Sequence, residues 1–221
     1  VMGERVFALH DLHYSYRTGH PVLSGADFEL QPGQRVALTG GNGSGKTTLF
    51  HVMMGLLLPQ QGQVYAYGRL CKAEVDFIPV RARTGLLFQD ADDQLFSPTV
   101  AEDIAFGPLN LGKSPQQAAA IVEEVLAQLQ MSGYETRITH HLSGGEKRMV
   151  ALATVLAMQP DVLLLDEPTN ALDEAAEARL VALLQGLPQA LVVISHDRRF
   201  LAQVTQRRVV LRDGLLLEGG A

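Results

Sequence analysis

A glycine-rich stretch at residues 40–48 has the residue types and the spacing of a phosphate-binding loop. Its sequence GGNGSGKTT matches the pattern GxxxxGK(S/T), in which the fixed positions are Gly40, Gly45, Lys46 and Thr47. Glycines let successive backbone N–H groups turn toward one anion, the lysine reaches the outer phosphates, and the threonine hydroxyl can ligate Mg²⁺. A chance glycine-rich turn is the alternative, but an apolar strand over 35–39 and helical spacing over 48–54 flank the loop. We therefore predict a nucleoside triphosphate and magnesium at a helix N-terminus, in contact also with Asn42, Gly43, Ser44 and Thr48.

Two adjacent carboxylates, Asp166 and Glu167, lie at the end of a second apolar run, residues 161–166. Such a run is typical of a central parallel strand, and open α/β sheets bind ligands at the carboxyl ends of their strands. We expect Asp166 to hold Mg²⁺, directly or through water, and Glu167 to orient and deprotonate the attacking water. An ordinary acidic loop would be the better interpretation without the phosphate loop upstream; with it, a magnesium strand is favoured.

Two further polar residues follow predicted strands. His196 comes after residues 190–195, where it can donate to the γ-phosphate and hold the attacking water in line. Gln89 comes after residues 84–88, and its amide can coordinate magnesium or the water. A lone histidine or glutamine is usually structural, so both assignments depend on position.

The stretch LSGGE at 142–146 opens a helix expected to run to Met158. Ser143 and Glu146 have the spacing of a capping box, so a well-capped helix start is the simplest interpretation. Gly144 and Gly145 indicate more than a capped helix start. Each glycine costs a helix up to about 1 kcal/mol relative to alanine, and each leaves backbone exposed for close approach by an anion. The sequence thus contains a second phosphate half-site. If the two half-sites lie far apart, only a head-to-tail dimer about a two-fold axis can join them.

The elements that must position these residues alternate between strands and helices, which indicates a parallel sheet wrapped by helices. We expect short antiparallel strands over 5–12 and 27–30, a hairpin at 63–67, a helix over 174–184 and a strand over 190–194. A capping box begins a helix at Thr99, and Ser114 with Pro115 begins another, so residues 90–158 form a helical insertion. Near the loop, either Tyr14 or Tyr16 could stack on a purine, although a lone tyrosine more often has a packing role.

Composition limits the remaining possibilities. The 221 residues are 47% hydrophobic and 19% charged, which suits one large globular domain. A net charge of −6 without a dense basic run argues against a nucleic-acid partner. We expect no membrane span, no secretion leader and no internal disulfide, since Cys71 is the only cysteine; these features indicate a soluble protein exposed to the cytosol.

Taken in order, these motifs resemble those of the ATP-binding-cassette (ABC) ATPases over the whole chain. The resemblance implies a single domain over 1–221 with a P-loop NTPase (RecA-like) parallel-sheet core, an N-terminal antiparallel β subdomain and an inserted α-helical subdomain. The core and β subdomain would be residues 1–89 and 159–221, and the helical subdomain residues 90–158. It also implies that two such domains sandwich two ATP molecules, each held by one phosphate loop and by Ser143, Gly144, Gly145 and Glu146 of the other subunit. Residues 170–173, with Asn170 and Asp173, would communicate across the dimer, and Tyr16 rather than Tyr14 would stack on adenine.

A narrower resemblance lies in residues 86–96 (LLFQDADDQLF) and 99–112. These are similar to the ATPases of energy-coupling-factor importers, above all those for cobalt and nickel. The resemblance implies a peripheral subunit at the cytoplasmic face of the cell membrane, whose segment after Gln89 faces a transmembrane coupling subunit that works with substrate-binding membrane subunits. An importer of vitamins and a soluble non-transport ABC ATPase are the alternatives; a GTPase or small-molecule kinase would not explain LSGGE. The sequence departs from the usual pattern at Glu146 and Asn170, and it ends soon after Glu218.

Overall fold

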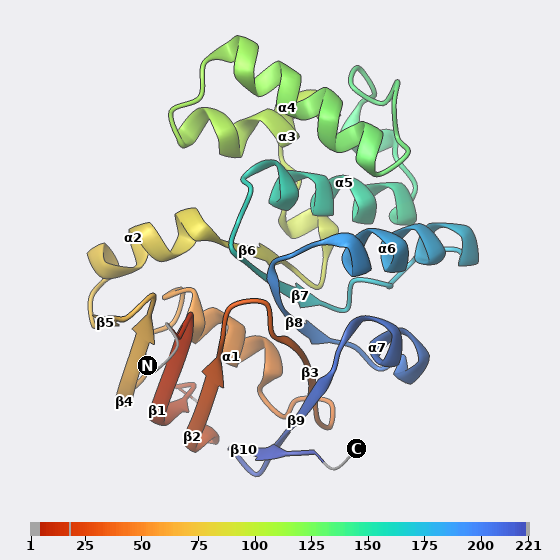
Figure 1. Ribbon diagram of the computed structural model, residues 1–221. Helices are drawn as coiled ribbons and strands as arrows, with labels where there is room; N and C mark the ends of the chain where they lie inside the picture. The colour runs from red at the N-terminus through yellow and green to blue at the C-terminus, as the bar shows by residue number, and fades with distance from the viewer. Residues whose placement is uncertain (1–4, 18, 220–221) are drawn as a thin grey trace.

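The computed structural model describes residues 5–17 and 19–219, so the expectations about the two ends of the chain, at residues 1–4 and 220–221, lie outside the described residues. A six-stranded sheet in the order β10-β9-β3-β8-β7-β6 forms the centre of the molecule (Figure 1). All neighbouring strands in it are parallel except β10 and β9. The strands are β3 (Arg35–Thr39), β6 (Thr84–Leu87), β7 (Val162–Asp166), β8 (Ala190–Ile194), β9 (Arg207–Arg212) and β10 (Leu215–Glu218).

A second, antiparallel sheet has the order β2-β1-β4-β5. It consists of β1 (Phe7–Ser15), β2 (Pro21–Leu30), β4 (Gln61–Ala66) and β5 (Arg69–Cys71), and the predicted hairpin turn at Gly68 is confirmed. The strands β1 and β2 are longer than predicted. The pairing register shifts after Leu9, and Asp11 has a φ of 50°, so a bulge breaks the period-two alternation although the strands continue to pair.

Helices cover both faces of the parallel sheet: α1 (Lys46–Met53), α2 (Glu74–Arg83), α3 (Val100–Asn110), α4 (Pro115–Gln128), α5 (Gly144–Ala157), α6 (Glu174–Gly186) and α7 (Arg198–Val204). The capping boxes predicted at Thr99 and Ser143 are confirmed, and Ser114 caps α4. The sequence did not predict α2, α7, β9 or β10. Helix α2 contains Pro79 and buries only Phe77 and Val80, so it lacks the apolar stripe on which such predictions depend.

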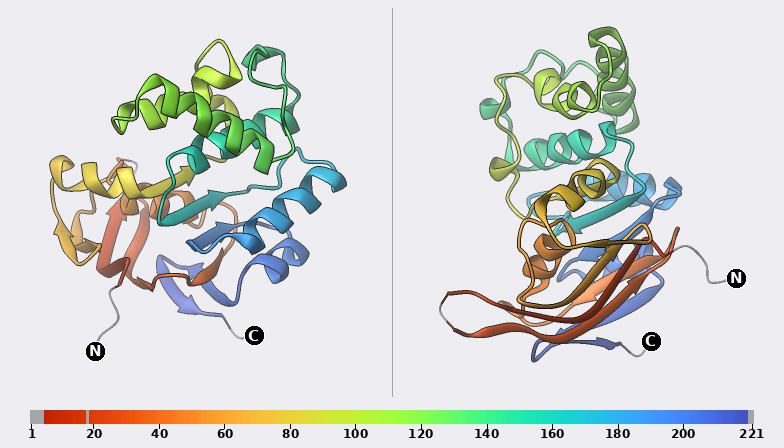
Figure 2. Two further views of the ribbon diagram at one scale, coloured as in Figure 1. Left: turned by 45° about the horizontal axis from the view of Figure 1, so that its top comes forward. Right: turned by 90° about the vertical axis from the view of Figure 1, so that its left-hand side faces the viewer.

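The strands β7 and β8 divide two hydrophobic cores. Leu163, Leu165 and Val193 pack with helices α3 to α7, whereas Leu164 and Val192 pack with α1, α2 and the antiparallel sheet. Figure 2 shows α3 and α4 at the opposite end of the molecule from the antiparallel sheet. The predicted fold class is therefore confirmed, and the division at residues 89 and 159 stays a prediction. Among the described residues, no helix has both the length and the apolarity needed to cross a membrane.

Candidate nucleotide site

The loop between β3 and α1 has the backbone shape that its glycines allow. Gly43 and Gly45 have φ values of 71° and 103°, in the left-handed region that favours glycine. A Cβ on Gly40 would lie 2.5 Å from the Leu211 carbonyl oxygen in β9 and 2.8 Å from the Ser44 Oγ, so a side chain there would collide with neighbouring backbone. The Lys46 Nζ donates to the carbonyls of Gly40 at 3.1 Å and Gly41 at 3.0 Å, which holds the ammonium group at the loop.

A cavity of about 670 Å³ opens in front of this loop, at the carboxyl ends of β3, β7 and β8. Its volume is in the range of ordinary ligand sites. Residues distant in sequence share its wall; besides loop residues 42–48, these include Tyr16, Gln89, Asp166, Glu167, Asn170 and His196. The structure thus brings most of the predicted site residues to one place, whereas their roles remain predictions.

Thr47 and Asp166 form the part of this cavity that suits a hard cation. The Thr47 Oγ1 donates to the Asp166 Oδ2 at 2.5 Å, so a hydroxyl and a carboxylate oxygen, both ligand types that Mg²⁺ prefers, lie together. Burial raises the pKa of Asp166, and the Thr47 hydrogen bond and the charges of Arg148 and Lys46 oppose that rise. A cation here would offset the desolvation of this carboxylate, and Gln89 lies on the same wall.

Glu167 follows Asp166 with a φ of 48° and is 7% exposed. Its Oε2 accepts from the backbone N–H of His196 at 3.3 Å, and its Oε1 lies 3.4 Å from the His196 Nε2. The Oε1 is buried and accepts no hydrogen bond from the residues that the structure describes. Glu167 lines the nucleotide cavity, so its carboxylate is placed where a general base can act on a water molecule.

Tyr16, and not Tyr14, lies at the cavity. Its hydroxyl is 3.0 Å from the Thr48 Oγ1, and the residue is 45% exposed. Tyr14 stands edge-on to it at 5.1 Å and packs against the core on its other side. The exposed ring is therefore available for stacking.

The LSGGE stretch lies outside this cavity. Gly144 lines an adjoining groove of about 520 Å³ together with Asp90, Asp92 and Asp93, and this groove shares Thr47, Gln89 and Asn170 with the nucleotide cavity. The structure adds a reason for Gly145 that the sequence did not reveal, because a Cβ there would lie 2.7 Å from the Ala171 carbonyl oxygen.

The carboxylate of Glu146 is used within the chain. Its Oε2 accepts from the Ser143 N–H at 2.9 Å and the Ser143 Oγ at 2.8 Å, and its Oε1 accepts from Tyr134 at 2.7 Å and Arg137 at 3.0 Å. These hydrogen bonds, those of Ser143 first, lower the pKa of Glu146 to about 2. The side chain therefore holds the turn that presents Ser143.

Comparison with known proteins agrees with this geometry. The family model described as ABC transporter matches residues 23–170. The chain belongs to the ABC transporter family. It is similar to a putative ABC transporter ATP-binding protein of Nitratidesulfovibrio vulgaris, at 49% identity over 97% of this chain and 79% of that protein. It is also similar to the energy-coupling factor transporter ATP-binding protein EcfA of Methanothermobacter thermautotrophicus, at 45% identity over 96% of this chain and 70% of that protein.

Two solved structures are similar to this ABC domain. One is cbiO1 of Clostridium perfringens, described as part of the ABC transporter complex cbiONQ, with a TM-score of 0.85 and 31% identity over 98% of this chain and 88% of that one. The other is the ATP-binding cassette MJ0796 in a dimeric post-hydrolysis state with ADP and Pi; its TM-score is 0.89, over 96% of this chain and 97% of that one, but its 24% identity supports the fold alone. As a member of the family, the chain is an ATPase, and ATP is the nucleotide of the predicted site.

The loop after Glu167 connects the ABC site to helix α6. Asn170 lines the nucleotide cavity, Ala171 has a φ of 63°, and the Asp173 side chain caps α6 by accepting from the Ala176 N–H at 2.7 Å. Asp173 therefore has a structural role in the subunit itself, and its predicted part in dimer communication remains untested.

Sequence reasoning missed Arg148, which is only 3% exposed. From the second turn of α5, its guanidinium group donates to the carbonyls of Phe88 and Gln89 after β6, and to those of Asp166 and Glu167 at the end of β7. One side chain thus joins the LSGGE helix, the Gln89 segment and the acidic pair of the ABC ATPase. A signal existed, since Arg148 directly precedes the apolar run from Met149 to Ala153 in the helix predicted to run to Met158.

Proposed function

We propose that this ABC ATPase works as a head-to-tail dimer that energises import by a membrane complex of the energy-coupling-factor type. The observation that supports the dimer is that none of Ser143, Gly144 and Gly145 lines the nucleotide cavity of their own chain. Gly144 lines an adjoining groove, which shares Thr47, Gln89 and Asn170 with that cavity. A second copy or a paralogue would supply Ser143 and the Gly144 and Gly145 amides to the far side of the γ-phosphate. Because the Glu146 carboxylate is already engaged, we propose that it acts on ATP only by holding Ser143.

The proposed hydrolysis uses groups that line the cavity. Glu167 takes a proton from the attacking water with its carboxylate, the water oxygen bonds to the γ-phosphorus, and the bond to the ADP oxygen breaks. Lys46 and His196 stabilise the charge on the transferred phosphoryl group. Thr47, Asp166 and Gln89 would hold magnesium, which neutralises phosphate charge when it is bound.

The surface proposed for the membrane partner lies on α3 and the segment before it. Phe96 and Phe106 are 63% and 49% exposed, and their rings stand edge-on at 4.8 Å. Leu109 and Leu111, at the end of α3 and directly after it, are also exposed. Exposed aromatic rings of this kind are typical of interfaces.

The acidic residues beside these rings suggest the partner's charge. The Asp92 carboxylate is 2.6 Å from the Lys147 Nζ, whereas Asp90 and Asp93 have no ion pair among the described residues. We therefore propose a partner helix with apolar and basic side chains, at the cytoplasmic face of the membrane.

Cobalt or nickel ions are the proposed cargo, because residues 86–112 resemble the ATPases of such importers most strongly. Vitamin import by a complex of the same type is the second candidate, and a soluble ABC ATPase without a membrane partner is the third. Contacts with the cargo would belong to the membrane subunits.

The test is to combine Asp93→Lys with Phe96→Ala, since neither residue lines the nucleotide cavity. With the membrane subunits purified alongside the protein, we expect ion uptake and co-purification to fall at least about tenfold while ATP affinity stays unchanged. The matched control is Glu123→Lys with Glu124→Lys, which changes exposed charges on α4. Full uptake by the Asp93/Phe96 variant would refute the docking surface, and loss of ATP binding would mean that this segment serves the nucleotide instead.

A further inference from the structure

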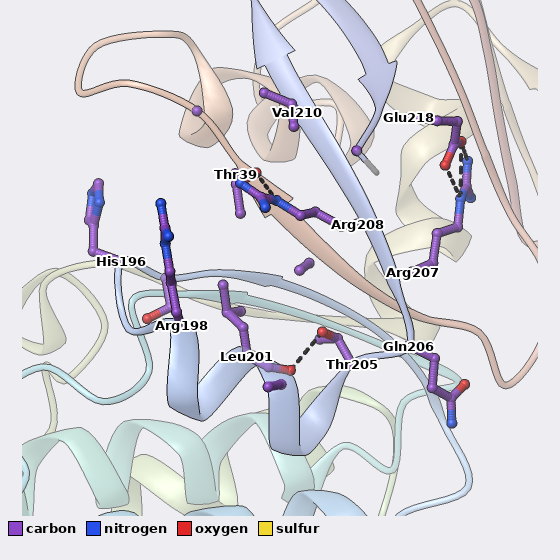
Figure 3. A pocket seen from close by; sticks show the side chains of 15 residues that line it. Thr39, His196, Arg198, Leu201, Thr205, Gln206, Arg207, Arg208, Val210 and Glu218 are labelled. Atoms are coloured by element: carbon purple, nitrogen blue, oxygen red, sulfur yellow. Dashed lines mark hydrogen bonds and ion pairs between the residues drawn. The ribbon is translucent and has the colours of Figure 1, made fainter. Parts of the chain in front are cut away.

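A second cavity, of about 730 Å³, lies beside the nucleotide cavity and shares His196 with it. It is bounded by the carboxyl ends of β3 and β8, by α7 and by β9 (Figure 3). Leu201, Ala202 and Val210 give it apolar walls, and Thr39, Thr205 and Gln206 add uncharged polar groups. Neither the phosphate loop beyond Gly40 nor the acidic pair lines it, so it is a separate compartment behind the histidine.

The charges of this compartment are predominantly positive. Three guanidinium groups line it, against the single carboxylate of Glu218. Arg207 donates to both oxygens of Glu218, and this hydrogen bonding lowers the pKa of Glu218, so that carboxylate is already neutralised (Figure 3). The nearby Asp197 carboxylate accepts from the N–H groups of Arg199 and Phe200.

Two guanidinium groups therefore remain for a ligand. Arg208 donates to the Thr39 Oγ1 at 3.3 Å, and neither it nor Arg198 has an ion pair within residues 5–17 and 19–219. Figure 3 shows Arg198 projecting in the same direction as His196, and Arg208 reaching toward Thr39. Guanidinium groups bind tetrahedral oxyanions well, because their N–H donors match pairs of oxygen atoms.

The opposite side of the nucleotide cavity has the reverse charge. The groove lined by Gly144 lies on that side, where it shares Thr47, Gln89 and Asn170 with the nucleotide cavity. It also contains Asp90, Asp92 and Asp93. Its two cations are engaged, since Lys147 pairs with Asp92 and Arg148 is buried against carbonyls. A departing anion would meet free carboxylates on that side and free guanidinium groups on the side of His196.

We propose that the compartment behind His196 is a binding site for the inorganic phosphate that ATP hydrolysis produces, with Arg198 and Arg208 as its ligands. The His196 side chain, 61% exposed, forms the partition that phosphate passes on leaving Glu167. Phosphate thereby leaves the site separately from ADP, whose own phosphates the loop retains. This inference rests on the proposed placement of the γ-phosphate beside Glu167 and His196, but it does not depend on what is transported.

The test measures binding of inorganic phosphate to the full chain loaded with ADP and Mg²⁺, by titration calorimetry at constant ionic strength. Combining Arg198→Gln with Arg208→Gln should raise the phosphate dissociation constant at least about fivefold and leave ADP affinity within about twofold. Combining Arg198→Lys with Arg208→Lys keeps both charges and should recover most of the affinity. The matched control is Arg199→Gln, which removes one charge from α7 outside the compartment and should change nothing.

A single-turnover experiment supplies the second readout. Chemical quench reports cleavage of ATP, and a fluorescent phosphate sensor reports release; the glutamine variant should cleave ATP at the wild-type rate with a changed release rate. Unchanged phosphate affinity in that variant, an equal loss in Arg199→Gln, or a parallel loss of ADP affinity would each overturn the proposal. Failure of ion uptake with normal phosphate binding would instead refute only the transport function.

Discussion

Arg148 offers the sharpest test of how the site is held together. Arg148→Met keeps an unbranched apolar stem out to the position of the arginine Nε and removes the donors of the guanidinium group. Four carbonyls, from the ends of β6 and β7, then lose the group that joins them. The perturbation is confined to the interior, because Arg148 is 3% exposed.

The expected loss of stability follows from two opposing effects. Hydrogen bonds to a charged group contribute about 1.5–3 kcal/mol each, which would sum to well above 5 kcal/mol for four carbonyls. Burial lowers the pKa of Arg148, which shows that desolvation of the charge opposes this gain. We expect Arg148→Met to lower the free energy of unfolding by about 3 kcal/mol. This value is near the lower end of the range found when one partner of a buried charged pair is removed. For a chain of this size, that corresponds to a fall in Tm of about 6–12 °C.

Catalysis should fall through kcat rather than KM. Arg148 does not line the nucleotide cavity, whereas the carbonyls it binds belong to Gln89, Asp166 and Glu167, whose side chains do. A displacement of about 1 Å there can cost about a hundredfold in rate. Thermal unfolding, nucleotide binding and steady-state ATPase assays measure the three effects separately.

Two variants serve as controls. Lys147→Met removes the neighbouring ion pair with Asp92 and should cost less than about 1 kcal/mol. Arg148→Lys retains a charge with fewer donors and should lie between wild type and Arg148→Met. If Arg148→Met unfolds within about 2 °C of wild type and keeps its kcat, the network carries neither the stability nor the positioning assigned to it.

Two further predictions concern the ATP site. Glu167→Gln should keep ATP binding, reduce turnover by about a hundredfold or more and favour a stable ATP-bound dimer; normal hydrolysis by this variant would exclude Glu167 as the general base. Ser143→Arg should block ATP-driven dimerisation, measured by light scattering, while the monomer binds ATP, and Ser143→Ala controls for the lost helix cap. Dimerisation of the arginine variant at wild-type ATP concentrations would rule out the sandwich.

The sequence determined the local parts of this protein. The phosphate loop, the helix starts at Thr99, Ser114 and Ser143, and the buried strands at 162–166 and 190–194 each depend on neighbouring residues, so their patterns can be read directly.

Only the tertiary structure decided how these parts meet. Arg148 joins segments 60 and 18 residues away, and no local pattern encodes such contacts. Gly145 is required by the backbone of Ala171, which the chain brings to it from another loop. The basic compartment likewise needs Arg198, Arg208 and Thr39 to meet, and those residues share no periodicity. Periodic patterns specify which residues become buried, but the free energy that selects among possible packings comes from contacts between distant segments.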